Sequence, residues 1–387
     1  MHVLIAPDKF KGSLTANAAA TAMAAGVQRA APHATVDVCP LADGGEGTVD
    51  VVLSARGGER RAARVTGPVG VPITAHWGLL ADGTAVIESA AAAGLELVPS
   101  AQRNPLHTTS RGVGELVLRA LDAGARRVVI GLGGTATCDG GLGLLQALGA
   151  RLEPATAASH GQDLLALERV DVSALEPRLT GTPLLVACDV TAPLFGPRGA
   201  ALGFAPQKGA SPELAAQLDR ALERLAELTR AARPLADPLT PGTGAAGGLG
   251  FALHAWCGAT LTSGADFVLD AVGIDERLAR ADYVLSGEGA LDAQTLQGKV
   301  VWALAQRAAR AGVPVVVLTG AERLPVEQVW EAGITAAFSI CDAPLPPDEA
   351  RARAPALVEQ RTAQVCRVWA SARGPDHARA RLGAVSS

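Results

Sequence analysis

Short apolar runs alternate along this chain with longer stretches in which the apolar residues are mostly alanine and leucine. The apolar runs end in Gly, Pro or Asp turns, and the stretches between them are long enough to form helices. This alternation is typical of α/β proteins, in which helices pack on a sheet. It predicts strands at 3–6, 36–39, 283–285, 315–318 and 336–340, and helices at 14–31, 299–311 and 325–332.

The middle of the chain shows a different pattern. Three segments mix apolar with polar positions, and Asp82-Gly83 joins the last two of them, as expected for antiparallel hairpin strands. Two continuous apolar runs follow. The strands predicted here are 61–66, 73–80 and 84–88, then 127–130 and 184–187.

The two patterns together predict the domain organisation. We expect a Rossmann-like doubly wound parallel sheet domain built from 1–59 and 263–372, with a second α/β domain, 60–262, inserted into it. The length of 387 residues fits two domains. Residues 373–387, rich in Arg, Ala, Gly and Ser, are expected to form a flexible C-terminal tail.

Composition narrows the class of protein. The net charge of −4, with no basic run longer than an Arg-Arg pair, argues against nucleic acid as a partner. No run of about 18 apolar residues marks a membrane span. The six cysteines include no Cys-x-x-Cys, which indicates neither a disulfide framework nor a zinc site. We therefore expect a soluble, cytoplasmic protein.

The lysines are scarce. Lysine and arginine total 34, and only four are lysines, which leaves 34 − 4 = 30 arginines. All four lysines lie in turn-rich stretches beside carboxylates or amides. Because an ammonium group is a compact point charge that grips phosphate without a planar fork, this placement suggests phosphate binding. The four are Lys9, Lys11, Lys208 and Lys299.

Six glycine-rich turns hold most of the remaining chemistry, and most directly follow a predicted strand, where open α/β sheets form ligand sites. Their amides can cradle phosphates, and their carboxylates can hold Mg²⁺ or act as a base. The fifth turn, 241–250, is expected to serve close helix packing. The others carry Asp8, Lys11 and Ser13; Asp43 and Glu46; Gly133, Gly134, Thr135, Thr137 and Asp139; Asp189 and Lys208; and Glu288, Asp292, Gln294 and Lys299.

Plainer interpretations stay open for several of these residues. Ser13 is also placed to cap the first helix, and Asp43 with Glu46 has the spacing of a capping box. The segment Gly131-x-Gly133-x-x-Ala136 loosely matches a dinucleotide-binding pattern, although Asp139-Gly140-Gly141 stands where its helix should already run. Neither a Walker loop nor the protein-kinase signature is present.

Eight stretches in one order resemble the bacterial glycerate kinase family that makes 2-phosphoglycerate, and the resemblance spans about residues 1–370. They are Ala-Pro-Asp-Lys-Phe-Lys-Gly-Ser-Leu (6–14), Ala-Asp-Gly-Gly-Glu-Gly-Thr (42–48), Thr-Thr-Ser-Arg-Gly-Val-Gly-Glu-Leu (108–116), Gly-Gly-Thr-Ala-Thr-Cys-Asp-Gly-Gly (133–141), Ala-Cys-Asp-Val-Thr-Ala-Pro-Leu (187–194), Pro-Gln-Lys-Gly-Ala (206–210), Gly-Ala-Ala-Gly-Gly-Leu-Gly (244–250) and Gly-Glu-Gly-Ala-Leu-Asp-Ala-Gln (287–294).

The resemblance implies ATP and Mg²⁺ as cofactors, D-glycerate as the substrate, and an active site in a cleft between the two domains. The chain departs from the family pattern at Cys138 and Ala192, where asparagine is usual, and at Ala290, where arginine is common. Lys9 stands at a variable position, so we favour Lys11 for phosphate. Both 2- and 3-phosphorylation stay open, and a homodimer is one compatible assembly.

The expected roles divide the candidates into four groups. Asp189, Asp8 and Lys208 are the catalytic candidates, and Asp189 and Glu288 are the candidate metal ligands. Substrate binding is expected from Lys11, Ser13, Asp43, Glu46 and Arg111. Nucleotide binding is expected from Gly133, Gly134, Thr135, Thr137, Asp139, Glu288, Asp292, Gln294 and Lys299. The alternative functions are an NAD(P)-dependent oxidoreductase of a small hydroxy acid and a non-catalytic sugar-acid sensor.

Overall fold

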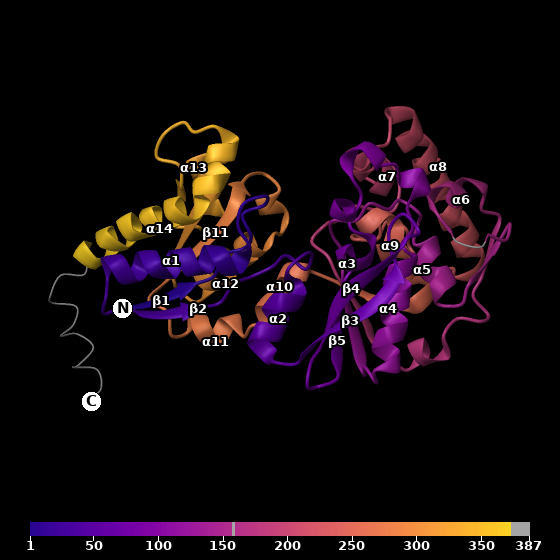
Figure 1. The fold of residues 1–387 in the computed structure, drawn as a ribbon, viewed down its shortest axis with the longest axis horizontal. Helices are drawn as coiled ribbons and strands as arrows, with labels where there is room; N and C mark the ends of the chain where they lie inside the picture. Colours follow the sequence, from indigo (N-terminus) through magenta and orange to yellow (C-terminus); the bar gives the residue numbers. More distant parts are fainter. Residues whose placement is uncertain (157–158, 373–387) are drawn as a thin grey trace. The chain divides into compact units, whose positions relative to one another are not determined.

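The computed structural model describes residues 1–156 and 159–372, so the tail expected at 373–387 lies outside the described residues. Backbone contacts divide the chain into two compact units. Unit 1 comprises Met1–Ala42 and the chain from Val272 onward, and unit 2 comprises Asp43–Ala271. Each unit holds a sheet with helices packed on it (Figure 1), so the α/β fold class predicted from the sequence is confirmed.

The five strands of unit 1 form one parallel sheet in the order β13-β12-β11-β1-β2. Along the chain this order places the second strand outside the first and the other three on its opposite side, which is a common doubly wound arrangement. Its switch point lies between β1 and β11. The strands are β1 (His2–Ile5), β2 (Thr35–Val38), β11 (Tyr283–Leu291), β12 (Val315–Glu322) and β13 (Ala336–Ser339).

All five strands predicted for this sheet are present, but β11 and β12 continue past their predicted ends. The sequence Ser-Gly-Glu-Gly-Ala looks like a turn, yet Gly287 pairs with Leu318 and Glu288 with Thr319. Glycine permits this because the backbones of β11 and β12 approach closely here: a side chain at Gly320 would meet the Gly289 carbonyl oxygen at 2.7 Å.

Helices α1 and α14 pack against each other over one part of this sheet (Figure 1). They share a hydrophobic core with Val3, Ile5 and Leu285 of the strands, while α12 packs on β11 and β12. The helices of unit 1 are α1 (Ala16–Ala30), α11 (Ile274–Leu278), α12 (Val300–Arg310), α13 (Val326–Glu331) and α14 (Pro347–Ala372), with a 3₁₀ turn at Thr295–Gln297.

The interpretation of Ser13 as the cap of the first helix is wrong. Helix α1 begins at Ala16, and Thr15 caps it by accepting a hydrogen bond from the Ala18 amide. The Ser13 hydroxyl instead donates to the Phe10 carbonyl at 3.0 Å. Both residues lie in the same polar turn, and the sequence alone did not distinguish between them.

Unit 2 holds a six-stranded sheet in the order β10-β9-β6-β5-β4-β3. The predicted hairpin is present, because β3, β4 and β5 are antiparallel, whereas β5, β6, β9 and β10 are parallel. The strands are β3 (Glu59–Thr66), β4 (Pro72–Leu79), β5 (Thr84–Glu88), β6 (Arg127–Gly131), β9 (Leu184–Ala187) and β10 (Thr260–Thr262), and a separate pair comprises β7 (Arg151–Glu153) and β8 (Arg169–Asp171).

The helices of unit 2 are α2 (Thr48–Arg56), α3 (Ala90–Ala93), α4 (Arg111–Asp122), α5 (Leu142–Ala147), α6 (Gly161–Ala166), α7 (Ala200–Phe204), α8 (Pro212–Ala232), α9 (Ala245–Cys257) and α10 (Gly264–Ala271). Short 3₁₀ turns lie at Leu95–Leu97, Ser100–Gln102, Pro105–His107, Pro177–Thr180 and Pro206–Lys208. Helix α2 packs on β4, β5 and α10, which places it with unit 2. The domain boundaries predicted from the sequence stay a prediction, and they differ from this grouping at 43–59 and 263–271.

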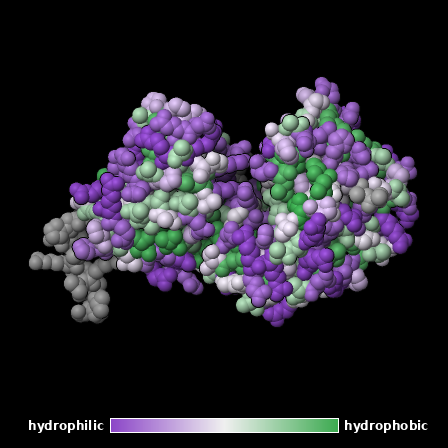
Figure 2. Space-filling model, in the orientation of Figure 1, coloured by the Kyte–Doolittle hydropathy of each residue, from purple (hydrophilic) through white to green (hydrophobic). Residues whose placement is uncertain are grey.

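Hydrophilic residues cover much of the face shown in Figure 2. Within the described part of the chain, no helix is both long enough and apolar enough to cross a membrane.

A loop formed by residues 43–48 lies directly on the edge of the unit 2 sheet. Gly44, with φ of +83°, sits against the Ala187 carbonyl oxygen and the backbone of Gly264. At the end of β6, a side chain at Gly131 would overlap the Gly44 carbonyl oxygen. Three glycines therefore let the backbone of the loop contact the backbone of the sheet edge.

Replacing Gly131 with alanine should destabilise unit 2, because the added methyl group meets backbone that cannot move aside independently. We expect a loss of about 3 kcal/mol in the free energy of unfolding, at the upper end of ordinary overpacking. Urea unfolding followed by circular dichroism measures it. The matched control is Gly181→Ala, since nothing lies within 4 Å of a Cβ there. Equal stability of the two variants would contradict the close contact.

Candidate active site

The carboxyl ends of the parallel strands in unit 2 gather polar residues at one edge of the sheet. Glu88 ends β5, and Asp189 and Ser263 follow β9 and β10 closely. Ligand sites of open α/β sheets form at such edges. The loop 43–48 covers this edge and adds the carboxylates of Asp43 and Glu46.

Asp189 is a buried carboxylate at this edge, and in the described part of the chain only one of its two oxygens has hydrogen-bond partners. Its Oδ1 accepts hydrogen bonds from the Ser263 hydroxyl at 3.3 Å and the Ala265 amide at 3.0 Å. Its Oδ2 is buried without a hydrogen-bond partner among the residues described. The pKa of Asp189 is raised to about 7, mainly by burial and in part by the nearby Asp43 carboxylate, while the hydrogen bonds that Asp189 accepts oppose the rise. A cation would offset the cost of two such carboxylates.

This arrangement fits Mg²⁺, which takes carboxylate oxygens as ligands. The open Oδ2 of Asp189 supplies one such oxygen, and Asp43 lies close enough for its charge to act on Asp189. Glu288, our other candidate metal ligand, fits less well, because both of its oxygens already have partners in unit 1.

The loop carrying Asp43 and Glu46 does not form the capping box that their spacing suggested. Helix α2 begins at Thr48, its N-cap is Gly47, and no side chain caps it from within. The Asp43 carboxylate accepts a hydrogen bond from the Gly45 amide at 3.2 Å, and Glu46 is exposed. Both carboxylates thus belong to the loop rather than to the end of the helix.

Lys208 lies with the glycine-rich loop that follows β6. Lys208 is 4% exposed, and its ammonium group donates to the Thr137 carbonyl at 2.6 Å and to the Thr135 hydroxyl at 3.4 Å. Burial lowers the pKa of Lys208. The Thr137 hydroxyl is buried and has no partner within the described part of the chain. The structure thus brings three predicted residues together around one buried hydroxyl that has no hydrogen-bond partner among the described residues. Of the glycines in this loop, Gly134 is exposed and Gly133 is half-buried.

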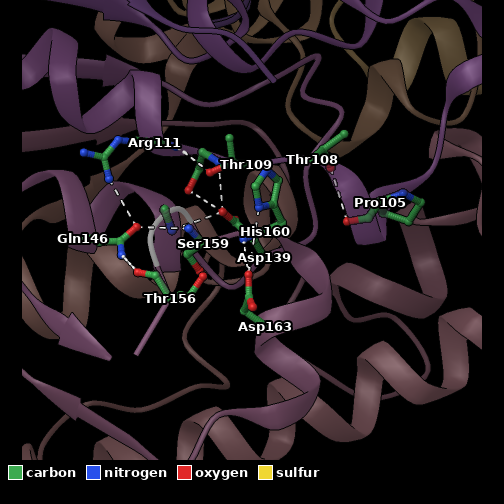
Figure 3. A network of polar contacts seen from close by, with 12 residues as sticks. Pro105, Thr108, Thr109, Arg111, Asp139, Gln146, Thr156, Ser159, His160 and Asp163 are labelled. Atoms are coloured by element: carbon green, nitrogen blue, oxygen red, sulfur yellow. Dashed lines mark hydrogen bonds and ion pairs between the residues drawn. The ribbon is translucent and has the colours of Figure 1, made fainter. Parts of the chain in front are cut away.

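The Asp139 carboxylate is buried and accepts hydrogen bonds from the protein itself (Figure 3). Its Oδ2 accepts hydrogen bonds from the amide and hydroxyl of Ser110, at 2.9 and 2.7 Å, and from the Gly143 amide at 3.2 Å. Its Oδ1 accepts one from the Gly141 amide at 3.1 Å. Because Ser110 and Gly141 are the N-caps of α4 and α5, this carboxylate stabilises the starts of two helices. In this conformation Asp139 organises the loop instead of facing a nucleotide.

Arg111 begins α4 and is half-buried. Its Nε donates to Glu115 at 3.0 Å and its Nη1 to the Gln146 side chain at 3.2 Å, as Figure 3 shows for the second contact. The guanidinium is therefore held in place by the protein, and its role in binding substrate stays a prediction.

Unit 1 has its own group of candidates at the end of β11. Glu288, 4% exposed, accepts a hydrogen bond from the Thr295 hydroxyl at 2.8 Å. The Lys299 ammonium lies 3.5 Å from Glu288 and 3.8 Å from Asp292. Burial raises the pKa of Glu288, and Lys299 opposes that rise. Gln294 is exposed beside this cluster.

The first polar turn lies at the switch point of the unit 1 sheet. The Asp8 amide donates to the Gly287 carbonyl at 2.9 Å, and Asp8 is 7% exposed. The Lys11 side chain is exposed, and a Cβ on Gly289 would lie 3.0 Å from the Lys11 amide. Asp8 and Lys11 thus stand next to the β11 segment that carries Glu288.

The dinucleotide-binding interpretation fails on the local structure. That motif needs a helix that starts within its glycines. Strand β6 ends at Gly131, but α5 begins only at Leu142. The segment between them is a loop, which removes the helix end that would bind a pyrophosphate.

Comparison with known proteins decides the family. The model of the Glycerate kinase family matches residues 3–370. The chain belongs to the glycerate kinase family. A glycerate 2-kinase of Escherichia coli K12 is 45% identical over 88% of this chain and 90% of its own length. A glycerate kinase of Bacillus subtilis 168 is also 45% identical, over 93% of this chain and 95% of its own.

A solved structure supports the same fold. The crystal structure of a protein from Salmonella typhimurium LT2, assigned as glycerate kinase 2, superposes with a TM-score of 0.82 at 43% identity. It covers 96% of this chain and 99% of its own.

Two departures from the glycerate kinase pattern are buried in unit 2. Cys138 is fully buried, and burial raises the pKa of its thiol to about 11. It stands in the loop that Lys208 contacts. Ala192 is buried, and its carbonyl accepts a hydrogen bond from the Gly244 amide at 3.0 Å. Both side chains fill space as apolar groups here, so they add no charge to the site.

Sequence reasoning missed Glu88. Its Oε1 accepts hydrogen bonds from the amides of Gly47 and Val49, at 3.1 and 2.7 Å. The available signal was its position, as a carboxylate directly at the end of the predicted strand 84–88. The hairpin pattern of this strand gave no sign that it also pairs in parallel with β6.

The Asp139→Asn variant should lose stability, because the new amide group would direct hydrogens at amides that now donate to a carboxylate. We expect a loss of about 2–3 kcal/mol in the free energy of unfolding, measured in urea. The control is Asp237→Asn, because Asp237 is exposed and accepts one hydrogen bond, from the Leu239 amide at 2.9 Å. An Asp139→Asn variant as stable as this control would show that the network is not needed.

Proposed function

We propose that this chain is an ATP-dependent glycerate 2-kinase that transfers the γ-phosphoryl group of ATP to D-glycerate and releases 2-phosphoglycerate and ADP. Membership of the glycerate kinase family supports the reaction class, and the E. coli relative is named a glycerate 2-kinase. The observation that carries the proposal is the buried Oδ2 of Asp189, which has no hydrogen-bond partner within the described residues and lies near the Asp43 carboxylate. A cytoplasmic location and a homodimer remain predictions.

Phosphoryl transfer needs little covalent help from a protein. It requires groups that hold phosphate oxygens and one group that accepts the hydroxyl proton. Bound Mg²⁺ would neutralise charge on the phosphates, and Asp189 and Asp43 would hold it. When the hydroxyl oxygen bonds to the γ-phosphorus, the bond to the bridging oxygen breaks and ADP leaves. Without a bound cation the raised pKa of Asp189 suits it as the proton acceptor near neutral pH. A cation held on its Oδ2 would lower that pKa, so the metal and base roles of Asp189 are alternatives.

The remaining residues of unit 2 fit contacts with phosphate and substrate. Donors come from one loop and one 3₁₀ turn: the Thr135 hydroxyl, the Thr137 hydroxyl that is unpaired within the described chain, and the Lys208 ammonium group. The amides of Gly133 and Gly134 belong to the same loop, and Glu46 and Arg111 are assigned to glycerate. We now assign Asp139 to loop stability, since its oxygens already accept four hydrogen bonds.

In unit 1 we assign nucleotide contacts to the group at the end of β11. Lys299 is half-buried between two carboxylates, which fixes its ammonium group in position. Lys11 is exposed and is proposed to bind phosphate, with Asp8 as a further catalytic candidate. The residues proposed for unit 1 are Asp8, Lys11, Ser13, Glu288, Asp292, Gln294 and Lys299.

A coupled assay with ATP, Mg²⁺ and D-glycerate tests the proposal. Glycerate-dependent ADP release is expected, and enolase added alone should convert the product directly, as only 2-phosphoglycerate allows. A product that needs a mutase before enolase would be 3-phosphoglycerate and would overturn the regiochemistry. Glycerate binding without ADP release would favour a sensor, and NADH binding without ADP release an oxidoreductase.

Asp189→Asn should lower turnover on the order of a hundredfold or more, because the neutral amide does not accept the proton and holds a divalent cation more weakly than a carboxylate. The coupled assay at saturating substrate measures it. Asp270→Asn is the matched control, since Asp270 is exposed on α10 in the same unit. Turnover of Asp189→Asn at the level of this control would remove Asp189 from the mechanism.

A further inference from the structure

Helix α2 begins without a capping side chain of its own. Its N-cap is Gly47, whose φ of +96° is in the left-handed region where side chains are disfavoured. The first amides of a helix have no partner inside it and need an acceptor, usually a Ser, Thr, Asp or Asn at the N-cap. Because glycine offers none, these amides must find an acceptor elsewhere in the fold.

Glu88 supplies that acceptor from a different element. Its Oε1 accepts hydrogen bonds from the Gly47 amide at 3.1 Å and the Val49 amide at 2.7 Å. Glu88 is the last residue of β5 and pairs in register with Gly131 of β6, so the sheet fixes its backbone. A carboxylate at a helix N-terminus also meets the positive end of the helix dipole.

Because the capping carboxylate comes from β5, it connects the start of α2 to the sheet. An acceptor supplied by the loop itself would leave the loop unattached to β5. Glu88 instead ties the end of the loop 43–48 to the sheet edge, on which Gly44 rests at the loop's other end. The loop carries Asp43, whose charge acts on Asp189.

The buried position of the Glu88 carboxylate disfavours its charged form. Burial raises the pKa of Glu88 to about 7, and the carboxylates of Asp50 and Glu46 add to the rise, while the two amide hydrogen bonds oppose it. These are the groups on α2 and the loop that act on it. A neutral acceptor of the same length, glutamine, would keep the amide contacts without this cost.

We propose that Glu88 is a positioning residue for the kinase reaction: by binding the amides of Gly47 and Val49, it holds the loop 43–48 so that Asp43 stays beside Asp189. The inference rests on the proposed function for its kinetic consequence. Glu88 acts through the loop and takes no direct part in the transfer.

Two variants of Glu88 separate its role as a hydrogen-bond acceptor that anchors the loop from the effect of its negative charge. Glu88→Ala removes the acceptor, whereas Glu88→Gln keeps a carbonyl oxygen at the same reach. We expect hydrogen exchange, measured by mass spectrometry on peptides within 43–56, to be about tenfold or more faster in Glu88→Ala. Turnover should fall about tenfold in the same variant while the KM for ATP changes less than threefold, and Glu88→Gln should restore both. Glu96→Ala, which removes an exposed carboxylate, is the control.

Each of the following outcomes contradicts one part of the proposal. Exchange in Glu88→Ala equal to wild type would overturn the anchor. Faster exchange with wild-type turnover would overturn the positioning role. Failure of Glu88→Gln to restore turnover would show that the charge acts directly, which also contradicts the proposal. If Glu88→Ala does not fold, Glu88→Asp replaces it, because the shorter side chain does not reach both amides. Absence of glycerate-dependent ADP release in the wild type would instead refute the proposed function, and the exchange data would still test the anchor.

Discussion

The loop 43–48 contacts the edge of the unit 2 sheet backbone to backbone. Gly44 rests on Gly264 and the Ala187 carbonyl, and Gly131 leaves room for the Gly44 carbonyl. No side chain fits between these segments, so the loop packs directly on the ends of β6 and β9. That position brings the carboxylate of Asp43 close to Asp189, and it presents the first amides of α2 to Glu88. The electrostatics of the edge follow from this contact.

Two buried carboxylates, Glu288 in unit 1 and Asp189 in unit 2, differ in how their charge is compensated. In unit 1 the buried carboxylate of Glu288 faces Lys299 and the Thr295 hydroxyl, so its charge is balanced within the protein. In unit 2 Asp189 has only hydrogen-bond donors on one oxygen and none, within the described residues, on the other. A buried carboxylate left in this state is costly. Binding of a cation at Asp189 would therefore be driven partly by relief of this cost.

The sequence was enough to predict the five strands of the unit 1 sheet, five of the six strands of the unit 2 sheet, the hairpin and the polar strand ends, because each rests on local apolar pattern and turn chemistry. The short edge strand β10 was not predicted. It was not enough to place Asp139, since the same turn residues serve a ligand or two helix starts, and only the fold shows that Ser110 and Gly141 meet there. Glu88 was missed for a related reason: its partners lie about forty residues away, at a glycine whose lack of a cap means little until the helix start is known. The length of β11 depended on the close approach of Gly289 and Gly320.

The central claim is that the open oxygen of Asp189, next to Asp43, holds a divalent cation. Titration of the protein with Mn²⁺, followed by electron paramagnetic resonance and competed with Mg²⁺, tests it without catalysis. The wild type should bind Mn²⁺ in competition with Mg²⁺, and Asp189→Asn should bind it at least tenfold more weakly. Equal affinity of the two proteins for Mn²⁺ would contradict the account.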